Sequence, residues 1–256
     1  IEECKFNFIT GKGTITGTEE SNIILGCEKE HIITGDKGND IIFGGEVKNT
    51  YIFNSGDGTD IINYKGGNDV IKFTDVEITD ITFSNYDLEN QTFTMSYGTS
   101  DKITVKGLST DRNSVKIEDS TDTQYTIFVG DGDNNSSTVQ RPNSKENTLF
   151  ISSTGKDRFE GNTGINVFTN CNNSDSNIGA ADGTNIFLIT PEQSVNLYAQ
   201  GQNDKIIFKD LELSDLVCTF PTDSVGKVVI TNINNSQRIE LMNFATNNVN
   251  PTILDK

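Results

Sequence analysis

The stretch GDKGNDIIFGGEVKNTYIFNSGDGTDIINYKGGNDVIKF, Gly35–Phe73, decides the fold of this chain. It contains four short units, each a turn rich in Gly and Asp followed by two or three apolar residues. In the first unit, Gly35 and Gly38 tolerate a positive φ and allow a sharp turn, which Asp40 ends. Ile41–Phe43 then has the composition of a very short strand whose alternate residues face opposite ways.

The large apolar residues recur with a regular spacing. Five are nine residues apart, a sixth follows after eleven, and a seventh after nine more: Ile15, Ile24, Ile33, Ile42, Tyr51, Ile62 and Ile71. An amphipathic helix would need a period of about 3.6, and the interleaved glycines would penalise it. One unit cannot bury its apolar residue alone, so neighbouring units must stack. The spacing predicts stacked short strands with this column facing inward.

The unit Gly35–Phe43 resembles a known repeat. It fits the nonapeptide G-G-x-G-x-D-x-U-x, where U is large and apolar, with Asp36 in place of the second Gly. This is the calcium-binding β-helix repeat of the RTX proteins. Residues 51–108 are similar to the haemolysin-type calcium-binding protein related domain, which follows such repeats in many secreted bacterial proteins. The matching segments are YIF at 51–53, GDGTDII at 56–62, NDVIKF at 68–73 and DKITV at 101–105.

The resemblance implies a column of metal-ligand positions. In the RTX β-roll, successive turns alternate between two sides, and each calcium ion lies between turns two units apart. The ligand position stands two residues before each inward residue, and here it reads Gly13, Asn22, His31, Asp40, Asn49, Asp60 and Asp69. Asn22, Asp40 and Asp60 would share one side, and the remaining four the other. Carboxylate oxygen suits calcium, but only three of these seven residues carry it.

Three candidate calcium sites follow from this arrangement. The best lies between turns 35–40 and 55–60, with Asp40 and Asp60 as anchors; its turns also contain Gly35, Asp36, Gly38, Gly56 and Gly58. A weaker site pairs Asn22 with Asp40, and a third pairs Asn49 with Asp69. The alternative is that these Asn and Asp side chains only form Asx turns with nearby backbone.

The second half of the chain repeats the first. Residues 203–216, NDKIIFKDLELSDL, match residues 68–81, NDVIKFTDVEITDI, at an offset of 135. The inward column continues through Leu149, Phe159, Phe168, Ile178, Phe187, Leu197 and Ile206. The ligand column, however, reads Asn147, Asp157, Asn166, Ser176, Asn185, Val195 and Asp204. Because neutral Asn side chains can share amide hydrogen bonds along a ladder, we expect this half to hold together with little or no calcium.

The segments after each repeat array read as antiparallel strands. The apolar alternation over residues 74–108 predicts two or three of them, with a turn at 98–101. The DGDNN segment at 131–135 resembles the start of an EF-hand, but Pro142 stands at the twelfth loop position, where Glu is needed. The predicted fold is all-β: two tandem parallel β-rolls, each with a small antiparallel cap, in domains 1–139 and 140–256.

Composition excludes some classes of function. The 256 residues carry 20 basic and 37 acidic side chains, a net charge of −17, so no basic patch is available for nucleic acid. Such a chain should attract cations and repel itself without them. No apolar run approaches the roughly 18 residues that span a membrane, so we expect a protein that is not membrane-spanning. The first residue is not Met and no signal peptide precedes the repeats, which we interpret as a fragment of a longer protein.

The sequence predicts no enzyme. His31 is the single His and has no marked nucleophile partner, so we interpret it as a turn residue. Carboxylate pairs leave glycosidase-type chemistry open on residue types alone. The cysteines depart from the RTX pattern: Cys4, Cys27, Cys171 and Cys218. No C-x-x-C spacing suggests zinc, the disulfide pairing stays open, and we expect mostly free, buried thiols.

The resemblance implies a function. It implies the non-catalytic, calcium-binding repeat region of a large secreted bacterial protein, such as a toxin, an adhesin or an exported hydrolase. Such proteins pass unfolded through a type I secretion channel and fold outside on calcium. The alternative is a receptor- or glycan-binding module of a bacterial toxin that is largely independent of calcium. The expected partners are calcium ions and, in the alternative, a host receptor or glycan.

Overall fold

The computed structural model describes most of the chain: residues 7–109, 115–132, 139–142, 145–154, 157–169, 177–179, 183–191, 193–198, 203–219, 221, 227–242 and 252–255. These residues form strands and two single-turn 3-10 helices, and no α-helix occurs among them. None of the described helices is long and apolar enough to cross a membrane. The chain divides into two compact units, residues 1–127 and 128–256.

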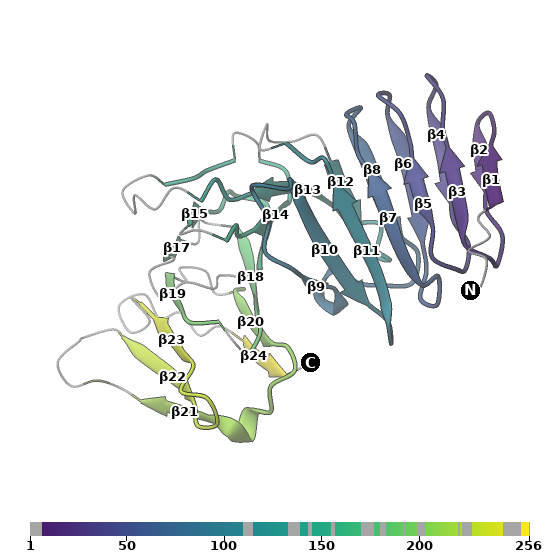
Figure 1. Cartoon of the computed structure of the whole chain (residues 1–256). Coiled ribbons are helices and arrows are strands. Elements are labelled where there is room, and N and C mark those ends of the chain that lie inside the picture. Colours follow the sequence, from purple (N-terminus) through teal and green to yellow (C-terminus); the bar gives the residue numbers. More distant parts are fainter. Residues whose placement is uncertain are drawn as a thin grey trace. The chain divides into compact units, whose positions relative to one another are not determined.

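Successive strands of the first unit alternate between two sheets, and the strands within each sheet run parallel to one another (Figure 1). One sheet holds, in spatial order, β1 (Asn7–Thr10), β3 (Asn22–Leu25), β5 (Ile41–Phe43) and β7 (Thr59–Asn63). The other holds β2 (Thr14–Thr16), β4 (His31–Thr34), β6 (Asn49–Phe53) and β8 (Asp69–Phe73). Ile24 pairs with Ile42, and Ile42 with Ile62, so one coil takes 18 residues (42 − 24) and the next takes 20 (62 − 42).

The predicted inward column forms the core of this unit. All seven of its residues are at most 2% exposed: Ile15, Ile24, Ile33, Ile42, Tyr51, Ile62 and Ile71. Because a strand alternates its faces, each short strand contributes one or two residues to the core, and stacking completes the burial. The predicted parallel β-roll is confirmed.

An antiparallel cap follows the coils of the first unit. β10 (Thr92–Tyr97) pairs antiparallel with both β9 (Thr82–Phe83) and β11 (Asp101–Lys106), and β11 continues the first sheet beside β7. β12 (Val115–Glu118) extends the other sheet beside β8 and pairs antiparallel with β13 (Gln124–Val129). The predicted hairpin with its turn near residue 98 is therefore present.

The second unit has the same plan. One sheet contains β14 (Thr148–Ile151), β16 (Ile165–Thr169), β18 (Thr184–Ile189), β20 (Lys205–Phe208) and β24 (Thr252–Asp255). The other contains β15 (Arg158–Glu160), β17 (Asn177–Gly179), β19 (Val195–Tyr198), β23 (Arg238–Leu241), β22 (Val228–Asn232) and β21 (Leu216–Thr219). β23 runs parallel to β19 while β22 pairs antiparallel with its two neighbours, as in the first cap. The 3-10 helices η1 (Ile78–Asp80) and η2 (Leu213–Asp215) stand 135 residues apart (213 − 78), the offset that the sequence repeat predicts.

Phenylalanines fill the core of the second unit. The rings of Phe150 and Phe168 stack with centroids 4.5 Å apart, and Phe168 stacks on Phe187 at 5.2 Å. The predicted inward residues of this half are buried wherever their side chains are described: Leu149, Phe159, Phe168, Phe187, Leu197 and Ile206. The Ile178 side chain lies outside the described residues.

The division between the units falls within β13, between residues 127 and 128. The sequence had placed it later, at 139/140, in the polar loop. The reason for the difference is Phe128, whose ring lies 5.4 Å from Phe150 and 6.2 Å from Phe159 and so belongs to the second core. Most of the loop itself, residues 133–138, lies outside the described residues.

The expectation of buried thiols is wrong for two cysteines. Cys27 and Cys218 are free and exposed. Cys27 stands in a turn just after β3, and Cys218 in β21 at the edge of its sheet, so neither position faces the core. Cys4 and Cys171 lie outside the described residues.

Candidate metal centre

The predicted ligand positions form two buried columns. Asn22, Asp40 and Asp60 stand at the starts of β3, β5 and β7, and His31, Asn49 and Asp69 at the starts of β4, β6 and β8. All six are at most 3% exposed. The predicted assignment of these residues to two sides of the roll is therefore confirmed. Burying polar groups is costly unless they find partners, so the hydrogen bonds of these side chains decide their role.

Each carboxylate in the first column accepts a backbone hydrogen bond from the neighbouring coil. Asp40 Oδ1 accepts the Asn22 N–H at 2.7 Å, and Asp60 Oδ1 accepts the Asp40 N–H at 2.9 Å. The second oxygen, Oδ2, of both Asp40 and Asp60 is buried and has no partner among the described residues. An ionised, buried oxygen without a donor is strongly disfavoured, so these two atoms call for a proton or a cation.

Further oxygen atoms surround this pair. Asp57 is 5% exposed and Asp101 is 6% exposed. Asp101 crosses from the cap to the turn and accepts the N–H groups of Gly56 at 2.9 Å and Gly58 at 3.0 Å. The hydroxyl of Tyr97, at the end of β10, is also buried without a partner among the described residues. The cap thus adds polar groups that the nine-residue repeat did not identify.

The electrostatics of the site follow from burial and crowding of like charges. Burial raises the pKa of Asp40 to about 6, and the carboxylates of Asp57 and Asp36 add to the rise. Burial raises the pKa of Asp60 to about 8, with Asp40, Asp57 and Asp101 contributing repulsion. Burial also raises the pKa of Asp57. Near neutral pH this cluster therefore binds protons readily, and a cation would compete for the same oxygens.

Glycine is required at two turn positions of the site. A Cβ added at Gly35 would lie 2.0 Å from Asp40 Oδ2, and one added at Gly58 would lie 2.1 Å from the Gly38 carbonyl oxygen. Gly58 also has a φ of 105°, which disfavours any side chain. Asp36, Gly38 and Gly56 have positive φ as well. These turns therefore bring backbone directly against the carboxylates.

The donors at this site are oxygen atoms, which are the ligands that calcium prefers. No three His, Cys, Asp or Glu side chains converge on one point within the described part of the chain, so side chains alone do not make a cage. Calcium takes six to eight oxygen ligands and accepts backbone carbonyls and water beside carboxylates. Asp40 and Asp60 would hold the ion through their partnerless oxygens, and the ion would neutralise the negative charge of these two carboxylates.

At the other two predicted sites, most side-chain oxygens already accept hydrogen bonds. Asp69 Oδ1 accepts the Asn49 N–H at 2.7 Å, and its Oδ2 accepts the Tyr51 hydroxyl at 2.8 Å. Asn22 Oδ1 accepts the Thr18 N–H at 2.7 Å, as in an Asx turn. Asn22 and Asp69 therefore serve the backbone and their neighbours. Beside Asp69, the amide oxygen Asn49 Oδ1 is buried without a partner among the described residues, but only the Asp40–Asp60 pair has two carboxylate oxygens in that state.

Comparisons with known proteins find a likeness in fold rather than in sequence. No protein-family model matches the chain, and no curated protein matches it. The fold is similar to the crystal structure of the extracellular lipase LipA from Serratia marcescens, with 13% sequence identity and a TM-score of 0.32. The match covers 91% of this chain and 38% of the lipase, so the chain spans well under half of that protein.

The ligand column of the second unit is a ladder of amides. The Asn166 Nδ2 donates to Asn185 Oδ1 at 3.1 Å, and the Asn185 Nδ2 donates to Asp204 Oδ1 at 2.8 Å. Asp157 is buried, but both of its oxygens accept hydrogen bonds: Oδ1 from Gly132 and Gln140, and Oδ2 from Ser153. The predicted Asn ladder is confirmed, and these carboxylates have donors within the protein.

Proposed function

We propose that this chain is a non-catalytic, calcium-binding repeat region of a secreted bacterial protein, and that its first unit completes its folding on calcium. The observation that carries the proposal is the pair of buried, partnerless oxygens on Asp40 and Asp60. Their position between stacked Gly-rich turns matches the site that the RTX resemblance implies. A β-roll with a net charge of −17 is also suited to a compartment rich in cations.

The ion would act as a fold-completing ligand rather than as a catalyst. Without it, Asp40 and Asp60 must either take up protons or leave ionised oxygens unpaired in the interior. With it, the turns at 35–40 and 55–60 become cross-linked. A protein built this way would stay loosely folded at low calcium and fold where calcium is millimolar, which suits export of an unfolded chain.

Calcium titration of the whole chain tests this function. We expect isothermal calorimetry at pH 7.5 to give a dissociation constant of about 10⁻⁴ to 10⁻³ M, as in extracellular modules. The double variant Asp40→Asn, Asp60→Asn should lose the site, since the amides keep the ladder acceptors but remove the charge. The matched control is Asp69→Asn, at the corresponding position of the other column, where both oxygens already have donors.

Two results would overturn the proposal. One is unchanged calcium affinity in the Asp40→Asn, Asp60→Asn variant, with the far-ultraviolet spectrum of the parent. The other is turnover of an ester or a polysaccharide that is lost on replacing a single acidic residue, because that would make the chain an enzyme.

A further inference from the structure

The chain's single histidine contacts a free cysteine. His31 Nε2 lies 3.2 Å from Cys27 Sγ, and His31 Nδ1 lies 3.2 Å from the Gly13 carbonyl oxygen. His31 is 3% exposed, whereas Cys27 is exposed. A carbonyl oxygen only accepts, so Nδ1 must carry the ring hydrogen, and the lone pair of Nε2 faces the cysteine.

The β-roll itself sets this arrangement. At other positions of the ligand column, which we also call ladder positions, an Asn oxygen accepts the backbone N–H of the residue four positions earlier. Asn22 accepts from Thr18 at 2.7 Å, and Asn166 accepts from Asn162 at 3.0 Å. His31 takes over this role, because its Nε2 accepts the Cys27 N–H at 3.1 Å. The coil geometry therefore places residue 27 beside the acceptor of residue 31, and here residue 27 is a cysteine.

The Cys27 thiol, the His31 ring and the Gly13 carbonyl are arranged like the nucleophile, base and orienting group of an activated nucleophile. A thiol lies within reach of an imidazole base, and the base is oriented by a carbonyl on its far nitrogen. The Cys27 N–H and the Cys27 thiol share one lone pair, so protonating Nε2 breaks the backbone bond. His31 can therefore take the thiol proton only while its Nε2 gives up the hydrogen bond from the Cys27 N–H.

We propose that Cys27 is a site of covalent modification by small cationic disulfides, with His31 as the base. His31 Nε2 takes the proton from the thiol, and Cys27 Sγ attacks one sulfur of the disulfide. The disulfide bond breaks as the new S–S bond forms, and the leaving thiolate takes the proton from Nε2. Cys27 is oxidised to a mixed disulfide, and half of the attacking reagent is reduced to a free thiol.

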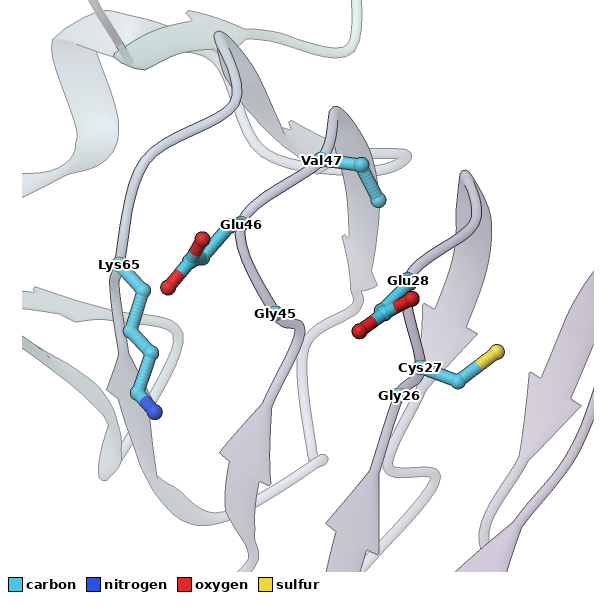
Figure 2. Close-up of a pocket in the computed structure, with 7 residues that line it drawn as sticks. All are labelled: Gly26, Cys27, Glu28, Gly45, Glu46, Val47 and Lys65. Carbon is cyan, nitrogen blue, oxygen red and sulfur yellow. The ribbon is translucent and has the colours of Figure 1, made fainter.

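The acidic character of the chain selects the class of disulfide. A groove of about 470 Å³ lies beside it, lined by Glu28, Glu46 and Lys65 among others. Figure 2 shows the two carboxylates on neighbouring coils, with the Cys27 sulfur on the side turned away from Glu46. With a net charge of −17 on the whole chain, a cationic reagent is attracted and an anionic one repelled.

Reaction rates of single-cysteine variants test the proposal. One variant retains only Cys27 (C4S, C171S, C218S) and the other only Cys218 (C4S, C27S, C171S). Cystamine is the cationic probe and 5,5′-dithiobis(2-nitrobenzoate) the anionic one, at pH 7 and low salt. An ordinary thiol is only a few per cent thiolate at this pH, so a base leaves room for about a tenfold gain. We expect Cys27 to react with cystamine about tenfold faster than Cys218. The ratio of the Cys27 rate to the Cys218 rate should be smaller with the anionic probe, and this ratio cancels the different leaving thiols of the two reagents.

His31→Asn is the decisive variant. Asn stands at this ladder position in other coils, so it can accept the Cys27 N–H and preserve the turn, but it cannot take a proton. The rate at Cys27 should fall to that of Cys218 while the thermal midpoint stays within a few degrees. Equal rates before and after the substitution, or a Cys27 no faster than Cys218, would overturn the proposal.

The unaltered histidine provides a second measurement that needs no variant at that position. Because the chain has one His, its ring gives one set of nuclear magnetic resonance signals. Modification of the Cys27-only chain by cystamine should shift the Nε2 signal, since the thiol hydrogen is lost. An unmoved signal in fully modified protein would contradict the contact between Sγ and Nε2.

Discussion

The two units share a frame and differ in the chemistry of their ladders. In the first, carboxylates stand at three of the seven ladder positions, and Asp60 Oδ1 accepts the Asp40 N–H while its Oδ2 stays unpaired among the described residues. In the second, Asn185 accepts from one neighbour through its oxygen and donates to the next through its Nδ2. Both Asp and Asn can accept a hydrogen bond from a backbone N–H. Only the Asn amide can also donate one to the ladder residue of the next coil.

This difference shows what stacking alone requires. Each coil presents a buried N–H at the ladder position, and any Asx oxygen meets that need. A carboxylate adds an acceptor and a charge but no donor, so a run of carboxylates needs a proton or a cation. The first unit is therefore the part of the molecule that should respond to calcium and pH, and the second is the part held by its apolar core.

The largest expected effect is a cavity in the second core. Phe168→Ala removes the middle ring of the Phe150–Phe168–Phe187 stack and should cost about 3–5 kcal/mol. The loss should be the same with calcium and with chelator, because no carboxylate is involved. Chemical denaturation of the whole chain measures it, and Phe8→Ala, at a ring 72% exposed, is the control with little effect. Full recovery of Phe168→Ala in calcium would show that the second unit also depends on the ion.

The second prediction concerns a substitution that changes the amide ladder of the second unit into a carboxylate ladder like that of the first. Asn185→Asp would place a carboxylate directly against Asp204 and remove the donor that joins them. A buried polar group left without its partner costs about 1–3 kcal/mol, and more when it is charged. We expect lower stability in chelator and partial recovery in millimolar calcium, measured by thermal melting. Asn234→Asp, in an exposed turn, controls for the added charge; an equal loss in both variants would contradict the ladder argument.

The stacking of the coils could be predicted from the sequence because it depends on the spacing of residues that are close together in the chain. The nine-residue column from Ile15 to Ile71 needs only the spacing of apolar residues, and every member proved buried. The Asn ladder followed from residue type at a fixed position. The site was harder, because its hydrogen bonds join residues a coil or more apart. Asp101 reaches Gly56 across 45 residues, and nothing in the repeat identifies it.

The contact between Cys27 and His31 was missed for a related reason. A spacing of four suggests contact on a helix, but here it arises in a turn whose shape depends on the ladder bond itself. The position of the domain boundary also depended on packing, since only the fold reveals which core receives Phe128.

The third prediction concerns pH in the absence of calcium. The pKa values of Asp40 and Asp60 rise from ordinary values near 4 to about 6 and about 8 in the folded chain. A raised pKa means that the folded state holds protons more tightly than the unfolded state, so stability is present at low pH and falls as pH rises through these values. In chelator, the melting temperature should therefore decrease from pH 5 to pH 8.5. Calcium should oppose the decrease, because it binds the ionised carboxylates. A melting temperature in chelator that is flat or rising over this range would contradict the site.

The smallest expected effect is the removal of calcium at one pH, and it compares the two units within a single molecule. At about 1–2 mM calcium, a site with a dissociation constant of 10⁻⁴ to 10⁻³ M adds roughly 0.4–2 kcal/mol by mass action. Hydrogen exchange at pH 7.5 can locate this difference along the whole chain. In chelator, the coils from β3 to β7 should lose protection by a factor of about 2 to 30. The strands β16, β18 and β20 should not change, because the amides of Asn166 and Asn185 are satisfied without an ion. Asp69→Asn should leave this pattern intact, whereas Asp40→Asn with Asp60→Asn should abolish the response to calcium. Equal loss of protection in both units would mean that the ion acts on the whole chain through its net charge rather than at the Asp40–Asp60 pair.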